Sequence, residues 1–170
     1  GRLVPVKNQQ LLLSALSIIQ SKIPHFKAII IGHGPLELAL KNQARQLNLL
    51  PFIDFIKTPQ AAKYYQTFDC FILPSHQEGQ SIALLEAMSW RVTPIVTSTD
   101  YKHDLVKHQH NGLICPPNDA SSLAQAIISI YENPKFNQQL AQQAYLTVKN
   151  NFNLEQVANN YLALYCLHQL

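Results

Sequence analysis

The 170-residue sequence has few charged side chains: Asp, Glu, Lys and Arg make up 14% of it, and the net charge is +3. It has no long basic block. Nucleic-acid-binding proteins need a clustered basic face, so the composition excludes nucleic acid as an expected partner. No apolar stretch reaches the roughly 18 residues that a membrane-spanning helix requires. Hydrophobic residues nevertheless make up 47% of the chain, which predicts one globular domain with a substantial core.

Cysteine is also scarce, with three widely spaced residues at Cys70, Cys115 and Cys166. No Cys-x-x-Cys pair offers a start for a metal site, and the three histidines between residues 103 and 110 lack metal-ligand spacing. We therefore expect no metal. Buried free thiols are typical of a reducing compartment, which favours a cytoplasmic protein.

Apolar strand-like runs alternate with stretches of helical period, which predicts parallel βαβ units in an α/β, Rossmann-like sheet flanked by helices. The expected strands are residues 28–31, 52–56, 70–73, 94–97 and 112–115. The first helix is expected to be about fifteen residues long and capped by Asn8. The other expected helices are residues 36–48, 59–67, 81–88, 100–108, 120–131 with Asp119 as cap, 135–150 and 154–168.

The most informative segment follows the strand at residues 70–73, which reads as buried. A loop carries Glu78 and Gly79, Ser81 opens a helix, and Glu86 lies among apolar residues of that helix. A carboxylate on an apolar face must be paired or hydrogen-bonded. Helical side chains lean toward the N-terminus, so we expect both carboxylates to face one space above the carboxyl end of a strand. Ligands of open α/β sheets bind in that crevice.

Residues 74–88, with the pattern Pro-Ser-x-x-Glu-Gly-x-Ser-x-x-Leu-Leu-Glu-Ala-Met, closely resemble the signature of the family 4 (group 1) retaining glycosyltransferases. Three further segments agree, in the family's order. Residues 1–3 with Lys7 resemble its Gly-Arg-Leu…Lys opening, residues 32–35 its Gly-x-Gly-Pro turn, and residues 111–119 its Asn-Gly-Leu-Leu-x-Pro-Pro-x-Asp segment. The resemblance covers essentially the whole chain.

This resemblance implies the C-terminal half of the two-domain GT-B fold. Residues 1–170 would form the nucleotide-sugar-binding domain, and residues 154–170 a helix that packs toward an N-terminal domain. The implied reaction transfers a hexosyl unit, with retention, from a UDP-, GDP- or ADP-sugar to a carbohydrate or lipid-linked acceptor held by that N-terminal domain. No cofactor or metal is implied, and such an acceptor is compatible with peripheral association of the full-length protein at the inner face of the membrane.

The donor chemistry gives each matching residue an expected role. A diphosphate needs cations, for which Arg2 offers a bidentate fork and Lys7 a point charge. The resemblance places Glu78 at the donor sugar and Glu86 at the ribose. One carboxylate can accept hydrogen bonds from both vicinal hydroxyls of a ribose. Amides at the start of the helix are expected to complete the phosphate site. They belong to the segment Gly79, Gln80, Ser81 and Ile82.

Two other segments are expected near the donor. Gly32 and Gly34 allow a tight turn after a strand, which the resemblance places beside the domain cleft. Residues 55–58, beginning with Phe55, follow the next strand, where the resemblance places contacts with the base made largely by the backbone.

Several alternatives stay open on the sequence alone. Arg2 could be a frayed terminal residue, Glu78 an exposed loop acid and Glu86 a purely structural carboxylate. Two carboxylates near an anomeric carbon also fit hydrolysis, although a cationic diphosphate site favours transfer. The alternative functions are a sugar-nucleotide epimerase of related fold and a non-catalytic binding module. The segments around Trp90 and Tyr101 lack glycines that the family commonly has, which keeps the binding module open.

Overall fold

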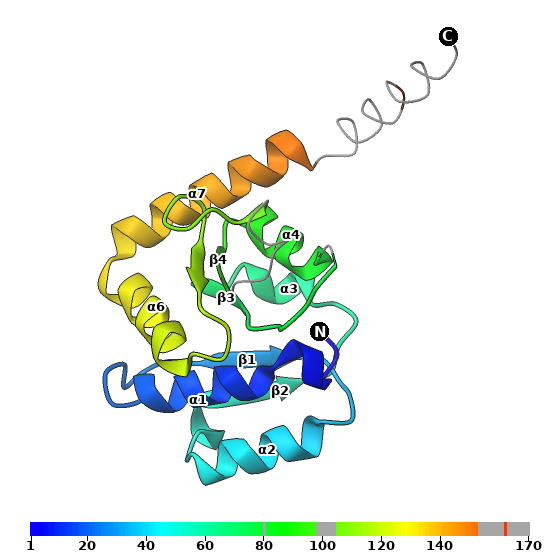
Figure 1. Ribbon diagram of the computed structural model, residues 1–170, viewed down its shortest axis with the longest axis vertical. Coiled ribbons are helices and arrows are strands. Elements are labelled where there is room, and N and C mark those ends of the chain that lie inside the picture. The colour runs from blue at the N-terminus through cyan, green and yellow to red at the C-terminus, as the bar shows by residue number, and fades with distance from the viewer. Residues whose placement is uncertain (80, 98–104, 153–161, 163–170) are drawn as a thin grey trace.

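The computed structural model of the chain describes residues 1–79, 81–97, 105–152 and 162 (Figure 1). Its strands are β1 (Ala28–Ile31), β2 (Ile53–Ile56), β3 (Cys70–Leu73), β4 (Thr93–Thr97) and β5 (Leu113–Cys115). Its α-helices are α1 (Gln9–Ile19), α2 (Glu37–Gln46), α3 (Ala62–Tyr65), α4 (Ile82–Ser89), α6 (Ala120–Glu132) and α7 (Pro134–Asn151). Short 3-10 helices occur at η1 (Pro5–Lys7) and η2 (Leu50–Phe52).

The described strands form two parallel sheets. β1 pairs with β2, with Ala28 opposite Ile53 and Ile31 opposite Ile56. In the other sheet β4 lies between β3 and β5. Parallel neighbours need crossover connections, and α2 supplies one between β1 and β2 while α4 supplies one between β3 and β4. The predicted α/β class with parallel, helix-flanked strands is confirmed.

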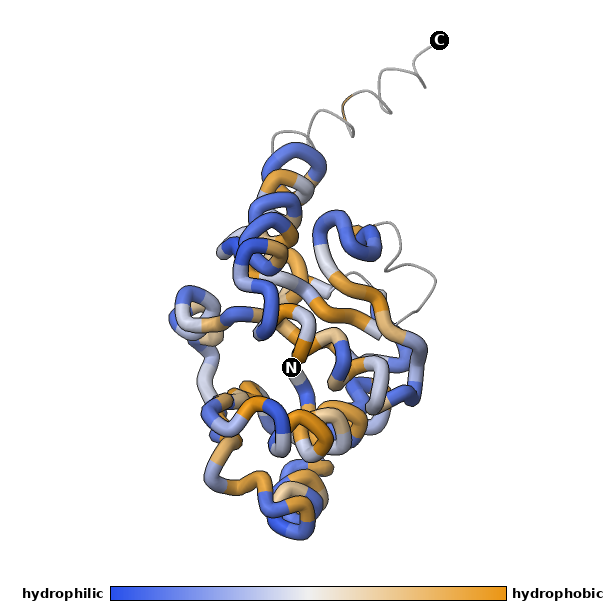
Figure 2. Tube along the Cα trace, turned by 90° about the vertical axis from the view of Figure 1, so that its left-hand side faces the viewer, coloured by the Kyte–Doolittle hydropathy of each residue, from blue (hydrophilic) through white to orange (hydrophobic). Residues whose placement is uncertain are grey.

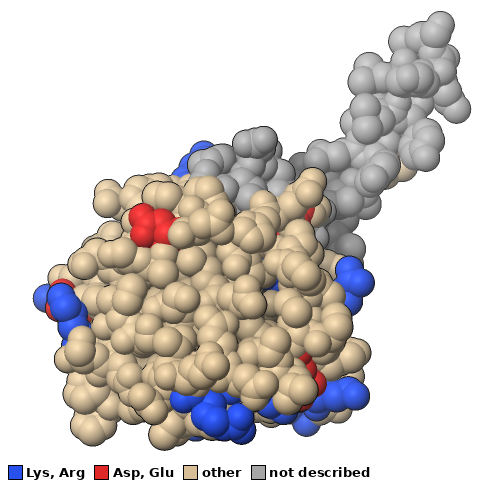
Figure 3. All heavy atoms as spheres, turned by 60° about the horizontal axis from the view of Figure 1, so that its bottom comes forward, with Lys and Arg blue, Asp and Glu red and all other residues tan. Residues whose placement is uncertain are grey.

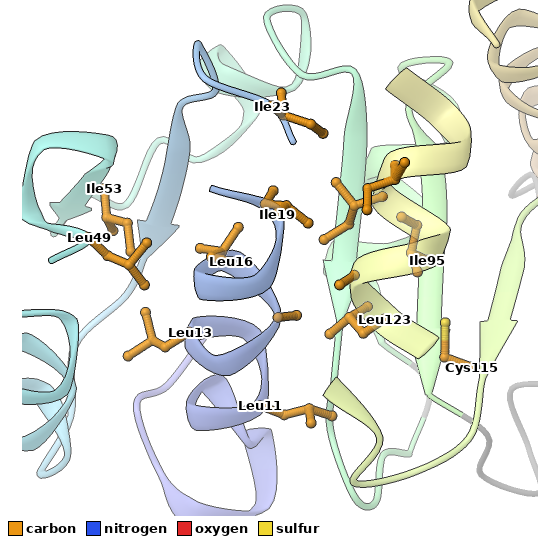
Figure 4. Packing of buried hydrophobic residues seen from close by; sticks show 14 of the residues in the cluster. Leu11, Leu13, Leu16, Ile19, Ile23, Leu49, Ile53, Ile95, Cys115 and Leu123 are labelled. Atoms are coloured by element: carbon orange, nitrogen blue, oxygen red, sulfur yellow. The ribbon is translucent and has the colours of Figure 1, made fainter. Parts of the chain in front are cut away.

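Helix α1 joins the two halves of the core. It packs against α6 and α2, and Leu13, Leu16 and Ile19, at spacings of three residues, lie on its buried apolar face. In Figure 4, Leu16 and Ile19 lie between Ile53 on one side and Ile95 and Leu123 on the other. Burying one such side chain contributes about 1.5–3 kcal/mol. The α1 face therefore holds both sheets in one hydrophobic core.

Few charged side chains lie on the face shown in Figure 3, in agreement with the low charged fraction of the sequence. Along the helices in Figure 2, hydrophilic and hydrophobic turns alternate, as expected for helices with one buried side. On the face shown in Figure 3, uncharged side chains dominate and Lys and Arg lie in separate groups near the margins. Within the described residues, no helix is long and apolar enough to cross a membrane.

The cap predicted at Asp119 is confirmed, and the one predicted at Asn8 is wrong. Ser81 accepts a hydrogen bond from the Leu84 amide at the start of α4, and Asp119 accepts one from the Ser122 amide at the start of α6. Asn8 makes no side-chain cap bond to α1. Its amide closes η1 on the Pro5 carbonyl oxygen, and this holds Asn8 in the left-handed region at φ 49°. Helix α1 begins directly after Asn8 but ends at Ile19, so its 11 residues fall short of the predicted length of about fifteen.

The other boundaries of the described elements agree with the predicted ones within a few residues. The strand β3 was predicted to be buried, yet Cys70, Phe71 and Ile72 are only partly buried. Cys115 is buried, and both it and Cys70 are free thiols, as predicted. Cys166, the helix predicted at residues 154–168 and most of the one predicted at 100–108 lie outside the described residues.

Candidate functional site

The loop after β3 is fastened to two other parts of the chain. The His76 amide donates to the Val6 carbonyl oxygen at 2.9 Å, which ties the loop to η1. The Thr97 hydroxyl, at the end of β4, donates to the Ser75 carbonyl oxygen at 2.9 Å. Both contacts use the loop backbone, so they fix its path whatever its side chains do. The loop therefore lies between the chain's opening segment and the carboxyl end of β4.

Glu78 lies at the centre of a partly buried polar cluster. Lys7 Nζ lies 2.5 Å from Glu78 Oε1, although the two residues are 71 positions apart in the sequence. The Ser75 hydroxyl donates to the same oxygen at 2.7 Å. The Glu78 side chain is 8% exposed and that of Lys7 is 23% exposed. Glu78 is thus a fixed carboxylate with two donors, and the possibility of an exposed loop acid is excluded.

Glu86 lies on the outer face of α4, so the expectation of a buried carboxylate is wrong. Leu84, Ala87 and Met88 form the buried side of the helix, at spacings of three and four residues. Glu86 lies about 100° around the helix from Ala87, at the usual 3.6 residues per turn, and is exposed. Ile82, one turn earlier, is 71% exposed on the same side.

Tyr65 holds the Glu86 carboxylate. Its hydroxyl lies 3.0 Å from Glu86 Oε2 and 3.3 Å from the Ala83 carbonyl oxygen, both of which can accept its proton. The Tyr65 ring is buried and contacts Phe68 and Phe71. Burial raises the pKa of Tyr65, and the hydrogen bond to Glu86 raises it further. The Tyr65 hydroxyl therefore stays protonated and donates to Glu86, and the buried ring holds it in place.

A cavity of about 1290 Å³ runs beside these groups and includes Lys7, Ser75, Ser81 and Glu86 in its lining. Glu78 does not line the cavity itself, but it contacts two residues that do, Lys7 and Ser75. Gln9 lines the same cavity, and its Oε1 is buried without a hydrogen-bond partner in the described part of the chain. A buried acceptor without a donor costs about 1–3 kcal/mol, so Gln9 offers an unused acceptor to a hydroxyl group.

The Gly-x-Gly turn has a structural role that the sequence did not reveal. The Leu3 amide donates to the His33 carbonyl oxygen at 3.0 Å, so the opening segment runs along this turn. A Cβ at Gly32 would lie 1.8 Å from the Gly1 carbonyl oxygen. A Cβ at Gly34 would lie 2.5 Å from the Leu3 carbonyl oxygen. Both glycines are therefore required by the close approach of residues 1–3.

The other residues predicted for the donor site are Arg2, Phe55, Gly79 and Gln80. Arg2 is exposed, and its carbonyl oxygen accepts a bond from the Gln9 side chain. Its guanidinium makes no ion pair with a described residue. Phe55 lies in β2, with the Lys41 ammonium 5.7 Å from its ring centroid. A Cβ at Gly79 would meet no heavy atom within 4 Å. Gln80 lies outside the described residues.

The turn near Trp90 lacks the glycine that the family commonly has, and Arg91 takes the conformation that favours glycine. Arg91 adopts the left-handed conformation, at φ 56°, that usually favours glycine. Its guanidinium lies 4.2 Å from the Tyr145 ring centroid, and its Nε donates to Gln142 at 3.2 Å. These contacts offset the conformational strain, so the turn into β4 forms without a glycine. The similar departure around Tyr101 lies outside the described residues.

Sequence reasoning missed three residues of this site. Ser75 is part of the Pro-Ser pair of the signature and could have been chosen from it. Tyr65 and Gln9 carry no motif, because their roles depend on how α3 packs against α4 and how α1 begins beside the opening segment. Among the described residues, no group of three or more His, Cys, Asp or Glu side chains could hold a metal ion.

Curated relatives of the chain are glycosyltransferases. An uncharacterized glycosyltransferase of Haemophilus influenzae is 29% identical over 161 residues, which cover 92% of this chain and 45% of that protein. The UDP-Gal:alpha-D-GlcNAc-diphosphoundecaprenol alpha-1,3-galactosyltransferase of Escherichia coli is 31% identical over 146 residues, covering 81% of this chain and 36% of that protein. The chain thus spans less than half the length of these two relatives.

Solved structures show the same fold. The C-terminal domain of LpcC, a glycosyl transferase group 1 family protein from Francisella tularensis, matches with a TM-score of 0.81 at 24% identity, covering 91% of this chain and 84% of that one. Anabaena Alr3699/HepE in complex with UDP matches with a TM-score of 0.88 at 22% identity, covering 100% of this chain and 47% of that one. The family model described as Glycosyl transferases group 1 matches residues 1–147. The chain belongs to the group 1 glycosyl transferases, and its described part has the fold of a GT-B C-terminal domain.

Proposed function

We propose that this chain binds the nucleotide-sugar donor of a retaining glycosyltransferase. The proposed reaction transfers a hexosyl unit from a nucleoside diphosphate sugar to a carbohydrate or lipid-linked acceptor. The observation that carries the proposal is the Lys7–Glu78 pair. It links Lys7 of η1 to Glu78 of the loop that leads into α4. A cation, an acid and a helix N-terminus are thereby brought together beside a cavity, although they are distant in the sequence.

The diphosphate is proposed to bind at Lys7 and at the amino end of α4. The first N–H groups of a helix have no partner within the helix, and the helix dipole favours negative charge there. Ser81 caps the Leu84 amide, so the N–H groups of Ile82 and Ala83 are the ones available to phosphate oxygens. Arg2, which is exposed, would add a second cation. These charges would stabilise the leaving diphosphate, so the proposed reaction needs no metal ion.

The ribose is proposed to bind at Glu86. Tyr65 occupies one carboxylate oxygen, Oε2, and fixes the plane of the group. The other oxygen keeps its acceptor capacity for the hydroxyls of a ribose. The exposed position of Glu86 on α4 suits this role, because a bound ligand has to reach the carboxylate from solvent.

Glu78 is proposed to face the donor sugar. Lys7 and Ser75 both donate to its Oε1, which leaves its second oxygen to accept a hydrogen bond from a sugar hydroxyl. A diphosphate that binds Lys7 would loosen the Lys7–Glu78 pair and free the acid for the sugar. Gln9, with its unused acceptor, is a further candidate for a sugar hydroxyl.

The names of similar proteins support this donor class. The Escherichia coli relative is named for a UDP-galactose donor and a diphosphoundecaprenol-linked acceptor. Anabaena Alr3699/HepE has been solved with UDP and with UDP-glucose. By analogy we propose that the acceptor binds mainly to a domain outside residues 1–170, and that the full-length protein works in the cytoplasm at the inner face of the membrane.

Calorimetric titration of the chain with UDP, GDP and ADP tests the donor site. We expect one nucleotide to bind, and Lys7→Ala and Glu86→Ala each to weaken binding at least about tenfold, the equivalent of about 1.4 kcal/mol. Lys22→Ala and Glu132→Ala, which change exposed residues of the same types, should leave the affinity unchanged. Equal binding by wild type and Lys7→Ala would refute the site.

Turnover by the full-length protein tests the reaction itself. Transfer of labelled sugar with retained anomeric configuration is expected, and Glu78→Gln should abolish it. Binding of a nucleotide sugar with no turnover of any donor would instead identify a non-catalytic module. Release of an epimerised sugar without an acceptor would identify an epimerase.

A further inference from the structure

The ladder between β3 and β4 ends just before the loop of the candidate site. Its last pair is Leu73 with Val96. Pro74, the next residue after β3, has no backbone N–H group, so it cannot donate to a continued ladder. The Thr97 hydroxyl makes the next connection instead, because it donates to the Ser75 carbonyl oxygen at 2.9 Å. A side chain at the carboxyl end of β4 therefore holds the start of the loop.

Ser75 and Thr97 are both polar residues in a buried position. Ser75 is fully buried and Thr97 is 1% exposed. A buried hydroxyl without a hydrogen-bond partner costs free energy, so such residues are normally paired. The Ser75 hydroxyl donates to Glu78 Oε1 at 2.7 Å. Thr97 is thus connected to the Glu78 carboxylate through a single residue, whose carbonyl oxygen accepts from Thr97 and whose hydroxyl donates to Glu78.

Lys7, the other donor to Glu78, is less suited to hold the carboxylate while a donor is bound. Lys7 has a flexible four-carbon stem and keeps 23% of its side-chain surface exposed. In the proposed site a diphosphate would compete with Glu78 for the Lys7 ammonium group. The Ser75 hydroxyl carries no charge, so a phosphate attracts it less strongly. With a donor bound, Ser75 would therefore be the contact that keeps Glu78 Oε1 in place.

We propose that Ser75 and Thr97 are positioning residues that orient the Glu78 carboxylate. Ser75 acts on the carboxylate directly, and Thr97 acts through the Ser75 backbone. The consequence for catalysis rests on the proposed function, in which the second oxygen of Glu78 accepts from a sugar hydroxyl. Both oxygens belong to one planar group, so anchoring Oε1 determines where the second oxygen points. A misplacement of about 1 Å near a reacting centre can lower a rate about a hundredfold.

Thr93 provides a matched control on the same strand. It is the first residue of β4 and is fully buried, and its hydroxyl donates to the Asn137 carbonyl oxygen of α7 at 3.1 Å. Thr93→Val therefore removes an equally buried hydroxyl whose partner belongs to α7 and not to the loop. Thr97→Val and Thr93→Val should both lower the melting temperature, so lost stability alone cannot make them differ at Glu78.

The NMR signal of the Glu78 carboxyl carbon tests the orientation without any ligand. In the isotope-labelled chain, we expect Ser75→Ala and Thr97→Val each to shift this signal. Thr97→Ser keeps the hydroxyl and should restore the wild-type position, and Thr93→Val should leave the signal in place. A Glu78 signal that does not move in Thr97→Val, or that moves as far in Thr93→Val, would overturn the proposal.

Turnover by the full-length protein separates positioning from donor binding. We expect Ser75→Ala and Thr97→Val each to lower kcat at least about fivefold, while the Kd of the nucleoside diphosphate that binds in calorimetry changes less than about twofold. Thr97→Ser and Thr93→Val should keep kcat near the wild-type value. Equal losses of kcat in Thr97→Val and Thr93→Val would refute the positioning role, because both would follow from a loosened fold. A wild-type protein that turns over no donor would refute the proposed function instead, and the Glu78 signal alone would then decide whether Ser75 and Thr97 orient the carboxylate.

Discussion

The Lys7–Glu78 pair should contribute measurably to the free energy of unfolding. The perturbation is a double-mutant cycle of Lys7→Met, Glu78→Gln and the two changes combined. Lys7→Met removes the charge and leaves a carboxylate that is 8% exposed with Ser75 as its remaining donor. Glu78→Gln keeps an oxygen that accepts from both donors but removes the negative charge. The coupling free energy of the cycle isolates the charge interaction.

The expected coupling follows from burial and distance. Two charges 4 Å apart attract with about 4 kcal/mol at an effective dielectric constant near 20, and the cost of removing them from water offsets part of this. Fully exposed pairs give about 0.2–1 kcal/mol. The pair lies between these limits, because Glu78 is almost buried and Lys7 keeps 23% of its side-chain surface exposed. We therefore expect a coupling of about 1–3 kcal/mol.

Urea unfolding followed by circular dichroism measures the cycle, and the chain supplies its own control. Lys27 and Asp54 lie 2.9 Å apart, but their side chains are 51% and 49% exposed. The matching cycle of Lys27→Met and Asp54→Asn should give less than about 0.5 kcal/mol, and 1 M salt should remove most of it. Equal coupling in the two cycles would refute the argument that burial strengthens the Lys7–Glu78 pair.

Three further predictions each concern a single residue. Tyr65→Phe removes the hydroxyl that holds Glu86 but keeps the buried ring, so it should cost about 1 kcal/mol of unfolding free energy. Calorimetry should show weaker binding of a nucleoside diphosphate and a smaller preference for it over its 2′-deoxy analogue. Gly79→Ala should leave the melting temperature unchanged, since a Cβ there meets nothing within 4 Å, yet weaken nucleotide binding. Gly112→Ala should lower the melting temperature, because its Cβ would lie 2.7 Å from Pro94.

Local chemistry made part of this fold predictable. Asp119 was correctly identified as a helix cap because it has a short polar side chain just before an apolar helical repeat. Asn8 satisfies the same rule and fails, because η1 ends at it and fixes its left-handed backbone. The rule describes one helix end at a time, whereas Asn8 belongs to the ends of two helices.

The site was predictable as a set of residues but not as an arrangement. The family resemblance pointed to Lys7 and Glu78 separately, and only the folded chain brings them into contact. Glu86 was expected to be buried because its sequence neighbours are apolar. Burial of Leu84 and Met88 fixes the rotation of α4, and that rotation turns Glu86 outward to Tyr65. Contacts of this kind depend on packing between elements, which sequence spacing does not encode.

The surroundings of each glycine distinguish the needs of the fold from those of a ligand. At Gly32 and Gly34 an added Cβ would strike the backbone of Gly1 and Leu3, so the fold alone requires glycine there. At Gly79 nothing in the described protein crowds an added Cβ. The group 1 signature nevertheless has glycine at this position, directly before the amino end of α4. In the proposed donor site, phosphate oxygens would meet the first amides of that helix. The proposed approach of a donor would account for the glycine of this loop, whereas the two glycines after β1 are required by residues 1–3, which run beside them.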